Sequence, residues 1–416
     1  MKKIFYCLVA AFVLAACVKE EASIAKVEEV KNPYAVTPDE AVQLLKTVIG
    51  GESTRAVSVG EIKTLRKSDF VPTTRGAEDG DVIYIVDLEN GGSAVMGADK
   101  RMEPIYAILD ETKISAEQLI SSATRSTELS NSIEDFVVGA LNGAIQVDLM
   151  AAGDLLLPEM PIVPIPRYVT VTTILDRKLP LLETKWGWIA PYSNMYPSET
   201  PCNDNAIIAI AQLLYFHRQP NTLGTYSLNW DLIAECEYGQ TPSVAAQNEV
   251  AKLFYALDQN GCNVSGMETH QVTQFLRNVG FAATTFGAYG ISYRPNKVKE
   301  QVDQNKLVMG YGATLNNNIK RYWLFDGYKF YREDVYYRVY DPMGSGTYTD
   351  TLESSTTYNL CHCNFGYQGV CDGYYPMDIF DLSTQLANKN LDNLNGDIAG
   401  TQAGVILNNN LMISTY

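Results

Sequence analysis

Histidine is scarce in this sequence, with three residues in 416: His217, His270 and His362. A mechanism that needs an imidazole as general base therefore has three candidates. Basic residues are also outnumbered, with 32 lysines and arginines against 48 aspartates and glutamates, which gives a formal net charge of −16. Because nucleic acids and anionic membrane surfaces attract basic proteins, this balance argues against both as partners.

Cysteine is infrequent as well. Two of the eight cysteines, Cys7 and Cys17, lie at the N-terminus, and the other six are too few for a disulfide scaffold in a chain of this length. Their pairing cannot be read from the sequence. Cys361-His362-Cys363 lacks the paired CxxC spacing of structural zinc sites. We therefore expect neither a metal ion nor an organic cofactor.

Long apolar runs are absent after the N-terminus, where a membrane-spanning helix would need about 18 such residues. The N-terminus itself combines a basic start, a short apolar run from Ile4 to Val13 and the sequence Leu14-Ala15-Ala16-Cys17. This pattern is typical of a secretory signal over residues 1–17. Its last four residues resemble a bacterial lipobox, which implies lipid on Cys17, and an ordinary signal peptide is the alternative. We expect a lipid-anchored protein of the bacterial outer membrane that contacts lipid only through its anchor.

The rest of the chain has a globular composition, with 46% apolar and 19% charged residues, and its length suggests two or three domains. Residues 18–32 are charged and form a tether. Residues 33–112 are predicted to form a small α+β domain. Its helix starts at Thr37-Pro38-Asp39-Glu40 and ends at Gly50. Its strands are expected at 82–86, 94–96 and 105–109. Residues 113–166 are expected to be helical from 115 to 150, with a break near Gly143, and then to form a proline-rich arm.

Residues 167–416 are predicted to form a second, mixed α+β domain with an antiparallel sheet. Its central helix spans Ala206 to Phe216, where Gln212 is the only clearly polar residue. A helix that is apolar on all sides is expected to be buried. Strands are predicted at 307–309, 322–325 and 335–340, with Asp326-Gly327 and Asp341-Pro342 as breaks between or after them.

Four segments of this second domain, in order, resemble the streptopain family of papain-fold cysteine peptidases. They are Lys185 to Tyr192, Asn205 to Gln212 with His217 and Pro220, Tyr322 to Tyr328, and His362 to Tyr367 with Gly373 to Tyr375. Upstream, Gly92 to Lys100 resembles part of the inhibitory propeptide that precedes these enzymes. The resemblance implies a papain-like fold with an antiparallel sheet and a buried central helix, behind a propeptide-like domain at 33–112.

The sequence departs from the family at the positions that carry catalysis. The family's nucleophilic cysteine lies seven residues before the glutamine of the AxAQ segment, and Asn205 stands there, which cannot form a thiolate. The family's histidine lies five residues before the aspartate of the Asp-Gly-Tyr turn, and Arg321 stands there, which cannot act as a base. Trp188 replaces the glutamine that stabilises the oxyanion. Asn364 is retained as the residue that would orient the histidine, but its tryptophan partner is Phe365.

These departures predict a peptidase fold without catalysis, which acts by binding a protein or peptide. An active paralogous peptidase is one candidate ligand. The alternative is an active cysteine endopeptidase, made as a zymogen, with a rearranged site. Cys202 lies three residues before Asn205, and His362 lies two residues before Asn364 on the same expected strand, so a Cys202–His362 dyad is the form that this alternative takes.

Overall fold

The computed structural model describes residues 34–50, 58–70, 79–124, 132–154, 167–196, 205–262, 267–286, 295–313, 320–340, 348–376, 378–381, 385–386, 389 and 412–415. Residues 36–416 form one compact unit, distinct from residues 1–35. The fold of this unit is mixed α+β with a large antiparallel sheet, which confirms the predicted class. Cys17, with the predicted signal and tether, lies outside the described residues.

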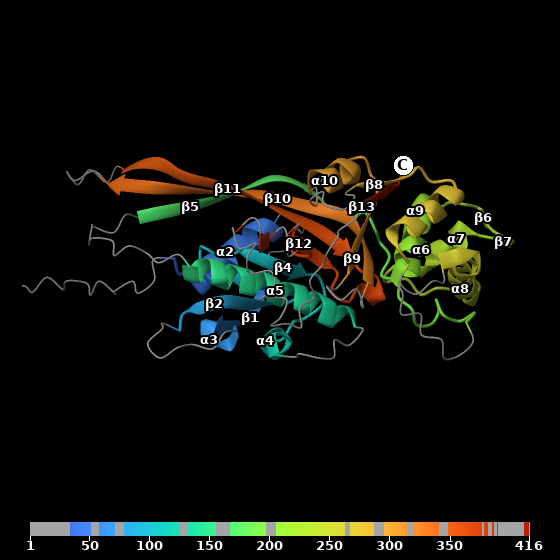
Figure 1. The fold of residues 1–416 in the computed structure, drawn as a ribbon, viewed down its shortest axis with the longest axis horizontal. Helices are drawn as coiled ribbons and strands as arrows, with labels where there is room; N and C mark the ends of the chain where they lie inside the picture. Colours follow the sequence, from blue (N-terminus) through green and yellow to red (C-terminus); the bar gives the residue numbers. More distant parts are fainter. Residues whose placement is uncertain are drawn as a thin grey trace, which may run out of the picture. The chain divides into compact units, whose positions relative to one another are not determined.

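One sheet of eleven strands organises the unit, and every pairing in it is antiparallel (Figure 1). Its main path is β1 (Val59–Arg66), β2 (Asp81–Leu88), β3 (Ser93–Gly97), β4 (Ile105–Leu109), β12 (Gly373–Pro376), β11 (Tyr348–Asn364), β10 (Lys320–Tyr340), β9 (Val308–Ala313), β13 (Met412–Thr415) and β8 (Ala283–Phe286). An additional strand, β5 (Arg167–Lys178), pairs with β10 off this path.

The first four strands belong to the segment 33–112 and carry a helix on each face. Their side chains alternate, as strand geometry requires. Ile83 and Ile85 of β2 join one buried cluster with α5 (Ile133–Asp154), whereas Tyr84 and Val86 join another with α2 (Pro38–Ile49). The start of α2 matches its prediction, since Glu40 N donates to Thr37 Oγ1 over 3.3 Å and Thr37 N donates to Glu40 Oε2 over 2.8 Å.

The predicted break near Gly143 is wrong, because α5 runs through this residue without interruption. A glycine inside a helix costs about 1 kcal/mol relative to alanine. Here apolar side chains on both sides of Gly143 are buried, and their packing outweighs that cost. Residues Ile133–Ala152 of α5 are long and apolar enough to cross a membrane. However, 67% of this apolar stretch is buried inside the protein, as in a core helix.

A second correction concerns Asp326-Gly327, which the sequence predicts to separate two strands. β10 instead continues from Lys320 to Tyr340, and its register with β11 shifts between Phe325 and Gly327. Asp326-Gly327 forms a bulge within β10 rather than a turn, because the Asp326 carboxylate is buried and bonds to His362 of the neighbouring strand. The described part of β10 reaches Tyr340, and the predicted break at Asp341-Pro342 lies outside the described residues.

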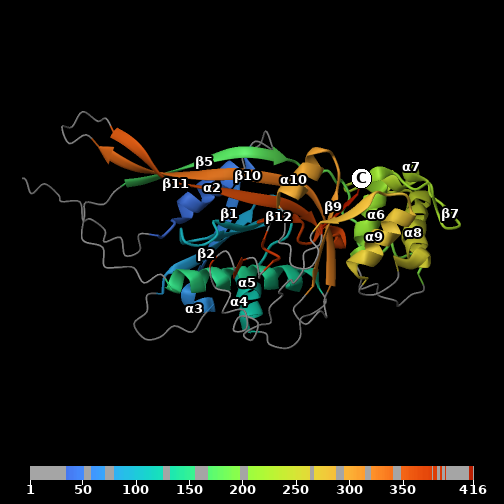
Figure 2. The same cartoon turned by 45° about the horizontal axis from the view of Figure 1, so that its top comes forward.

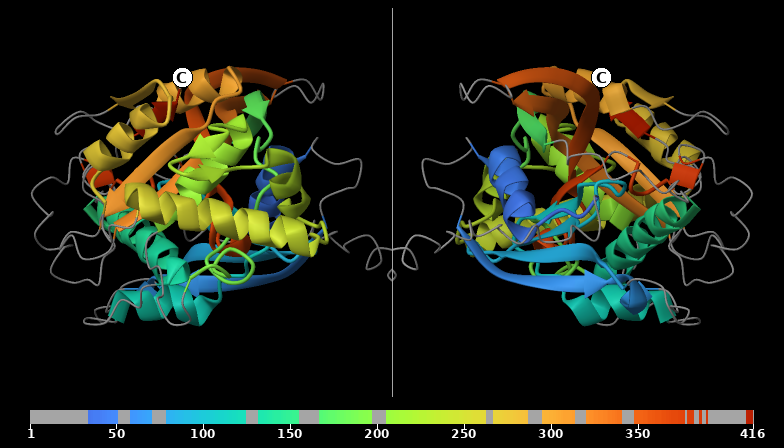
Figure 3. Two further views of the ribbon diagram at one scale, coloured as in Figure 1. Left: turned by 90° about the vertical axis from the view of Figure 1, so that its right-hand side faces the viewer. Right: turned by 90° about the vertical axis from the view of Figure 1, so that its left-hand side faces the viewer.

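The remaining helices gather mostly at one end of the sheet (Figure 2). Figure 3 looks along the sheet from both ends, with the helices from α6 to α9 in front in the left view. The central helix α6 (Asn205–His217) confirms the predicted buried helix, since its side chains from Ala206 to Tyr215 are all buried. The other elements are α3 (Lys67–Phe70), α4 (Ala116–Thr124), β6 (Thr222–Leu223), β7 (Tyr226–Ser227), α7 (Trp230–Ile233), α8 (Val244–Leu257), α9 (Thr269–Asn278), α10 (Pro295–Asp303), and short helical turns at Ala234–Cys236, Asp258–Cys262 and Tyr367–Gly369.

The sheet crosses the boundary that the sequence predicts after residue 112. Leu109 of β4 lies opposite Gly373 of β12, and Ile108 lies opposite Tyr374. The N-terminal strands and the strands of the second predicted domain are thus parts of one sheet. This junction places the segment 110–112, which directly follows β4, against the buried end of β11.

Candidate functional site

The N-terminus of α6 is where the family resemblance places a nucleophile. The helix begins at Asn205. Cys202 lies outside the described residues, as does the side chain of Asn205. The proposed pairing of Cys202 with His362 therefore stays a prediction, and only its histidine half is described.

Arg321, at the position of the family's histidine, lies near the start of β10 opposite Gly312 of β9. Its side chain is nearly inaccessible, with 3% of the residue exposed, and its Nη1 donates to the backbone oxygen of Lys320 over 2.9 Å. A guanidinium has no lone pair to accept a proton and stays charged at any physiological pH. This position thus provides a buried cation and no base.

Asn364, at the end of β11, belongs to a buried network of amides. Gln212 Nε2 donates to Asn364 Oδ1 over 2.9 Å, and Asn364 Nδ2 donates to the backbone oxygen of Thr184 over 2.9 Å. Gln212 Oε1 accepts from the Thr184 hydroxyl over 2.8 Å and from Trp186 N over 3.4 Å, while Gly366 N donates to Asn364 Oδ1 over 3.0 Å. The two amides thereby connect α6, the segment 184–186 and β11.

Gln212 was not predicted as a site residue, although the sequence singles it out as the one polar residue of an apolar helix. A buried amide on α6 that bonds to the segment 184–186 and to β11 stabilises the relative positions of these three parts. In the observed geometry Asn364 is engaged with Gln212 and Thr184 instead of with a catalytic base.

Trp188 packs as an aromatic side chain at the edge of the α6 core. Its ring lies 4.6 Å from the Tyr196 ring and 6.0 Å from the Phe254 ring, measured between centroids. Beside it, Ile189 is 59% exposed and Met195 is 42% exposed. The turn from 188 to 196 therefore presents apolar side chains to solvent around a partly buried tryptophan.

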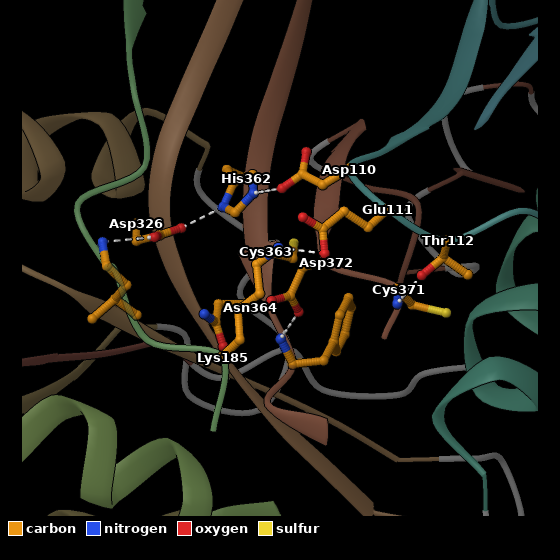
Figure 4. A network of polar contacts seen from close by, with 12 residues as sticks. Asp110, Glu111, Thr112, Lys185, Asp326, His362, Cys363, Asn364, Cys371 and Asp372 are labelled. Atoms are coloured by element: carbon orange, nitrogen blue, oxygen red, sulfur yellow. Dashed lines mark hydrogen bonds and ion pairs between the residues drawn. The ribbon is translucent and has the colours of Figure 1, made fainter. Parts of the chain in front are cut away.

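His362 lies between two carboxylates (Figure 4). Its Nδ1 is 2.6 Å from Asp326 Oδ1, and its Nε2 is 3.1 Å from Asp110 Oδ2. The residue is 4% exposed, and its ring meets the Tyr374 ring edge-on at 4.9 Å. Both ring nitrogens thus face anionic acceptors, an arrangement that favours the doubly protonated, charged ring.

The charge balance at His362 follows from these neighbours. Burial by itself lowers the pKa of the imidazole, but Asp326 and Asp110 outweigh burial and raise its pKa well above the usual 6.5. For Asp110, burial raises the pKa of the carboxyl, and the bond to His362 outweighs it, so that the pKa is lowered from 3.8. In this state the ring has no free lone pair that could take a proton from a thiol.

Four of the described cysteines are buried thiols with raised pKa values. Burial raises the pKa of the Cys236 thiol to about 11, and it also raises the pKa values of Cys361, Cys363 and Cys371. Since the thiolate is the reactive form, none of these four thiols is set up as a nucleophile. In the described ranges, no group of three or more His, Cys, Asp or Glu side chains could hold a metal ion.

Three aspartates of the His362 surroundings were missed by sequence reasoning: Asp110, Asp326 and Asp372. Asp372 is buried, and its carboxylate accepts from Phe365 N over 2.8 Å. Burial raises the pKa of Asp372 well above 3.8. Of the three, only Asp326 stands in a recognisable sequence pattern, the pair Asp326-Gly327, and this pattern predicts a turn and not a site.

Comparison with known proteins finds likeness among solved structures. No family model matches the sequence, and no curated protein matches it. Among solved structures, a fragment of prointerpain A from Prevotella intermedia, carrying a cysteine-to-alanine mutation, is similar over 84% of this chain and 98% of that chain. The identity is 15% and the TM-score is 0.48, so the likeness carries no conclusion about the site of this chain.

Proposed function

We propose that this chain is an envelope-anchored lipoprotein with a streptopain-like fold that has no peptidase activity and acts by binding a protein or peptide. The observation that carries the proposal is the buried guanidinium of Arg321, at 3% exposure, at the position where the family's base is expected. Asn205 at the expected nucleophile position supports it independently. The exposed Ile189 and Met195 beside Trp188 offer apolar contacts of the kind that peptide-binding surfaces use.

The alternative, an active endopeptidase that uses Cys202 with His362, needs His362 to exchange one of its carboxylate partners for a thiol. In the described geometry both of its ring nitrogens face aspartates. The Asp326 side chain is fully buried, so the loss of its partner would be strongly unfavourable, whereas the Asp110 side chain is 35% exposed and water could solvate it. The substitutions at positions 205 and 321 favour the binding function over this alternative.

The activity test compares four proteins on an unstructured protein substrate: the wild type, Cys202→Ala, Asn205→Cys and the combined variant Asn205→Cys, Arg321→His, Trp188→Gln. We expect no turnover by the wild type and no change in Cys202→Ala. Asn205→Cys should gain a thiol that reacts with an electrophilic probe, because a helix N-terminus lowers a thiol pKa, but it should recover little turnover without a base. Wild-type turnover that Cys202→Ala abolishes would establish the alternative instead.

The anchoring is tested separately by metabolic labelling with a fatty-acid analogue in a bacterial host. We expect label on the wild type and none on Cys17→Ser, because the acylated residue is the cysteine of Leu14-Ala15-Ala16-Cys17. Cys7→Ser serves as the control and should keep its label. Equal labelling of Cys17→Ser and the wild type would show that the lipoprotein assignment is wrong.

A further inference from the structure

The junction between β4 and β12 joins residues 36–154 to the later strands through backbone hydrogen bonds. Beyond the pairs at Leu109 and Ile108, Asp110 N donates to the backbone oxygen of Asp372 over 3.0 Å. Separation of the two parts would expose these backbone groups along both strands. A sheet edge opened in this way is unfavourable, because its buried donors and acceptors lose their partners.

The apolar core crosses the same junction. Phe136 of α5 stacks on Phe380 with 6.0 Å between ring centroids and lies 6.4 Å from Trp323 of β10. One buried cluster contains these rings together with Ile83 and Val95 of the N-terminal strands. Residues 36–154 therefore contribute to the core of the later strands and do not merely cover it.

The three side chains that follow β4, those of residues 110, 111 and 112, each contact a different segment beyond residue 167. We name these three residues the 110–112 clasp. Asp110 Oδ2 lies 3.1 Å from His362 Nε2, and Glu111 Oε2 lies 3.0 Å from Lys185 Nζ. Thr112 Oγ1 accepts from Cys371 N over 2.8 Å (Figure 4). The Tyr238 hydroxyl adds a bond to Glu111 over 2.8 Å.

Titratable groups face His362 from the elements packed against it. Asp326 and Lys329 belong to β10. Asp110 follows β4, and Asp372 precedes β12. Lys185 pairs with Glu111, the neighbour of Asp110 in the chain. The acids that touch the ring directly are Asp110 and Asp326. Lys329 lies over the Tyr374 ring, 3.7 Å from its centroid, and it favours an ionised Asp110.

We propose that residues 36–154 are a permanent part of the folded protein rather than a segment to be released, and that the 110–112 clasp closes on a charged His362 and loosens as the solution becomes alkaline. This inference concerns the assembly of the chain itself and does not depend on the proposed ligand.

The sign of the pH effect follows from His362 and Asp110, the two shifted groups that form the contact between the 110–112 clasp and β11. His362 has a raised pKa in the fold, so its stabilisation is complete below its usual value of 6.5 and is lost as the pH rises through the raised pKa. Asp110 has a lowered pKa, so its stabilisation is complete above 3.8 and is lost when the pH falls through the lowered value. The clasp is therefore tightest in mildly acidic solution. Unfolded thiols ionise around pH 8.5, so they contribute at the upper end of a window from about 6.5 to 8.5, and the His362→Gln variant, which keeps every thiol, controls for this contribution.

The first test cuts the chain between its two parts. A site for a sequence-specific protease is inserted between residues 154 and 167, the N-terminal part is immobilised by a tag, and the urea concentration that releases the other part is measured at pH 6.5 and 8.5. We expect no release in buffer, and release at lower urea at pH 8.5 than at pH 6.5. In His362→Gln this difference should become smaller, because the histidine contribution is removed and the contribution of the buried thiols remains. Release without urea would overturn the permanence of the segment, and an equal pH effect in wild type and His362→Gln would overturn the role of the clasp.

A second test does not require His362 to be replaced. Labelling of the Cε1 atoms of all histidines gives three NMR signals, since the chain has three histidines. His217→Gln and His270→Gln assign the third signal to His362 by elimination. We expect the His362 signal to titrate well above pH 6.5, and its midpoint to fall by about one pH unit or more in Asp110→Asn. Asp87→Asn, which removes an exposed partner of Lys113 in the same segment, is the matched control and should leave the midpoint unchanged. A midpoint near 6.5 in the wild type would contradict the clasp.

Discussion

Gln212→Leu is expected to lower the free energy of unfolding by about 2–5 kcal/mol. Leucine fits the apolar helix, but it leaves the Thr184 hydroxyl, the Trp186 amide and one bond of the Asn364 oxygen without their partner. Each buried polar group that loses its partner costs about 1–3 kcal/mol, and these groups are enclosed by the α6 core. Urea denaturation followed by tryptophan fluorescence measures the change.

Gln274→Leu is the matched control for this prediction. Gln274 lies exposed on α9 and bonds only locally to Asn278 over 2.8 Å. Its replacement should change stability by no more than about 0.5 kcal/mol. If both variants unfold at the wild-type urea concentration, the amide network does not connect α6 to β11 in the way that we describe.

Gly373→Ala should destabilise the protein by about 3 kcal/mol and should do so at the β4–β12 junction. A Cβ at Gly373 would lie 2.2 Å from the backbone oxygen of Ile108 and 2.9 Å from Leu109 Cα. Both atoms belong to the backbone of the partner strand, so neither can rotate aside, and the strands must separate. Hydrogen exchange at the Asp110 amide, which bonds to Asp372 across the junction, measures this separation locally.

Gly143→Ala is the control for Gly373→Ala, and its effect on the free energy of unfolding is expected to have the opposite sign. Nothing lies within 4 Å of a Cβ built at Gly143, which sits inside α5. Alanine there should stabilise the helix by about 0.5–1 kcal/mol. A Gly373→Ala protein with wild-type stability and wild-type exchange at Asp110 would show that β4 and β12 are not packed as closely as described.

Local sequence patterns predicted much of the helical structure. The capping residues of α2 fix its start, because the bonds between Thr37 and Glu40 join residues only three apart. The burial of α6 followed from its composition alone. The prediction failed at Gly143 and at Asp326-Gly327, where residues that usually interrupt helices and strands are retained by burial of their neighbours.

The His362 surroundings could not be predicted, because their members are distant in sequence. Asp110 is 252 residues from His362, and Asp326 is 36 residues from it. The sheet register brings these residues together: β4 pairs with β12, β12 with β11, and β11 with β10. In the sequence His362 has only Cys361 and Cys363 as neighbours, and Cys202 was the partner predicted for it.

Residue types and local patterns were enough to predict the fold class, the start of α2 and the buried central helix, and they place an amide at position 205 and a guanidinium at position 321. These properties depend on residue type and on contacts within a few turns of the chain. The position of His362 between Asp110 and Asp326, and the bonds of Asn364 to Gln212 and Thr184, became known from the folded structure. The physical reason is that burial and sheet register, which are set by the whole fold, select the partner of each of these polar groups.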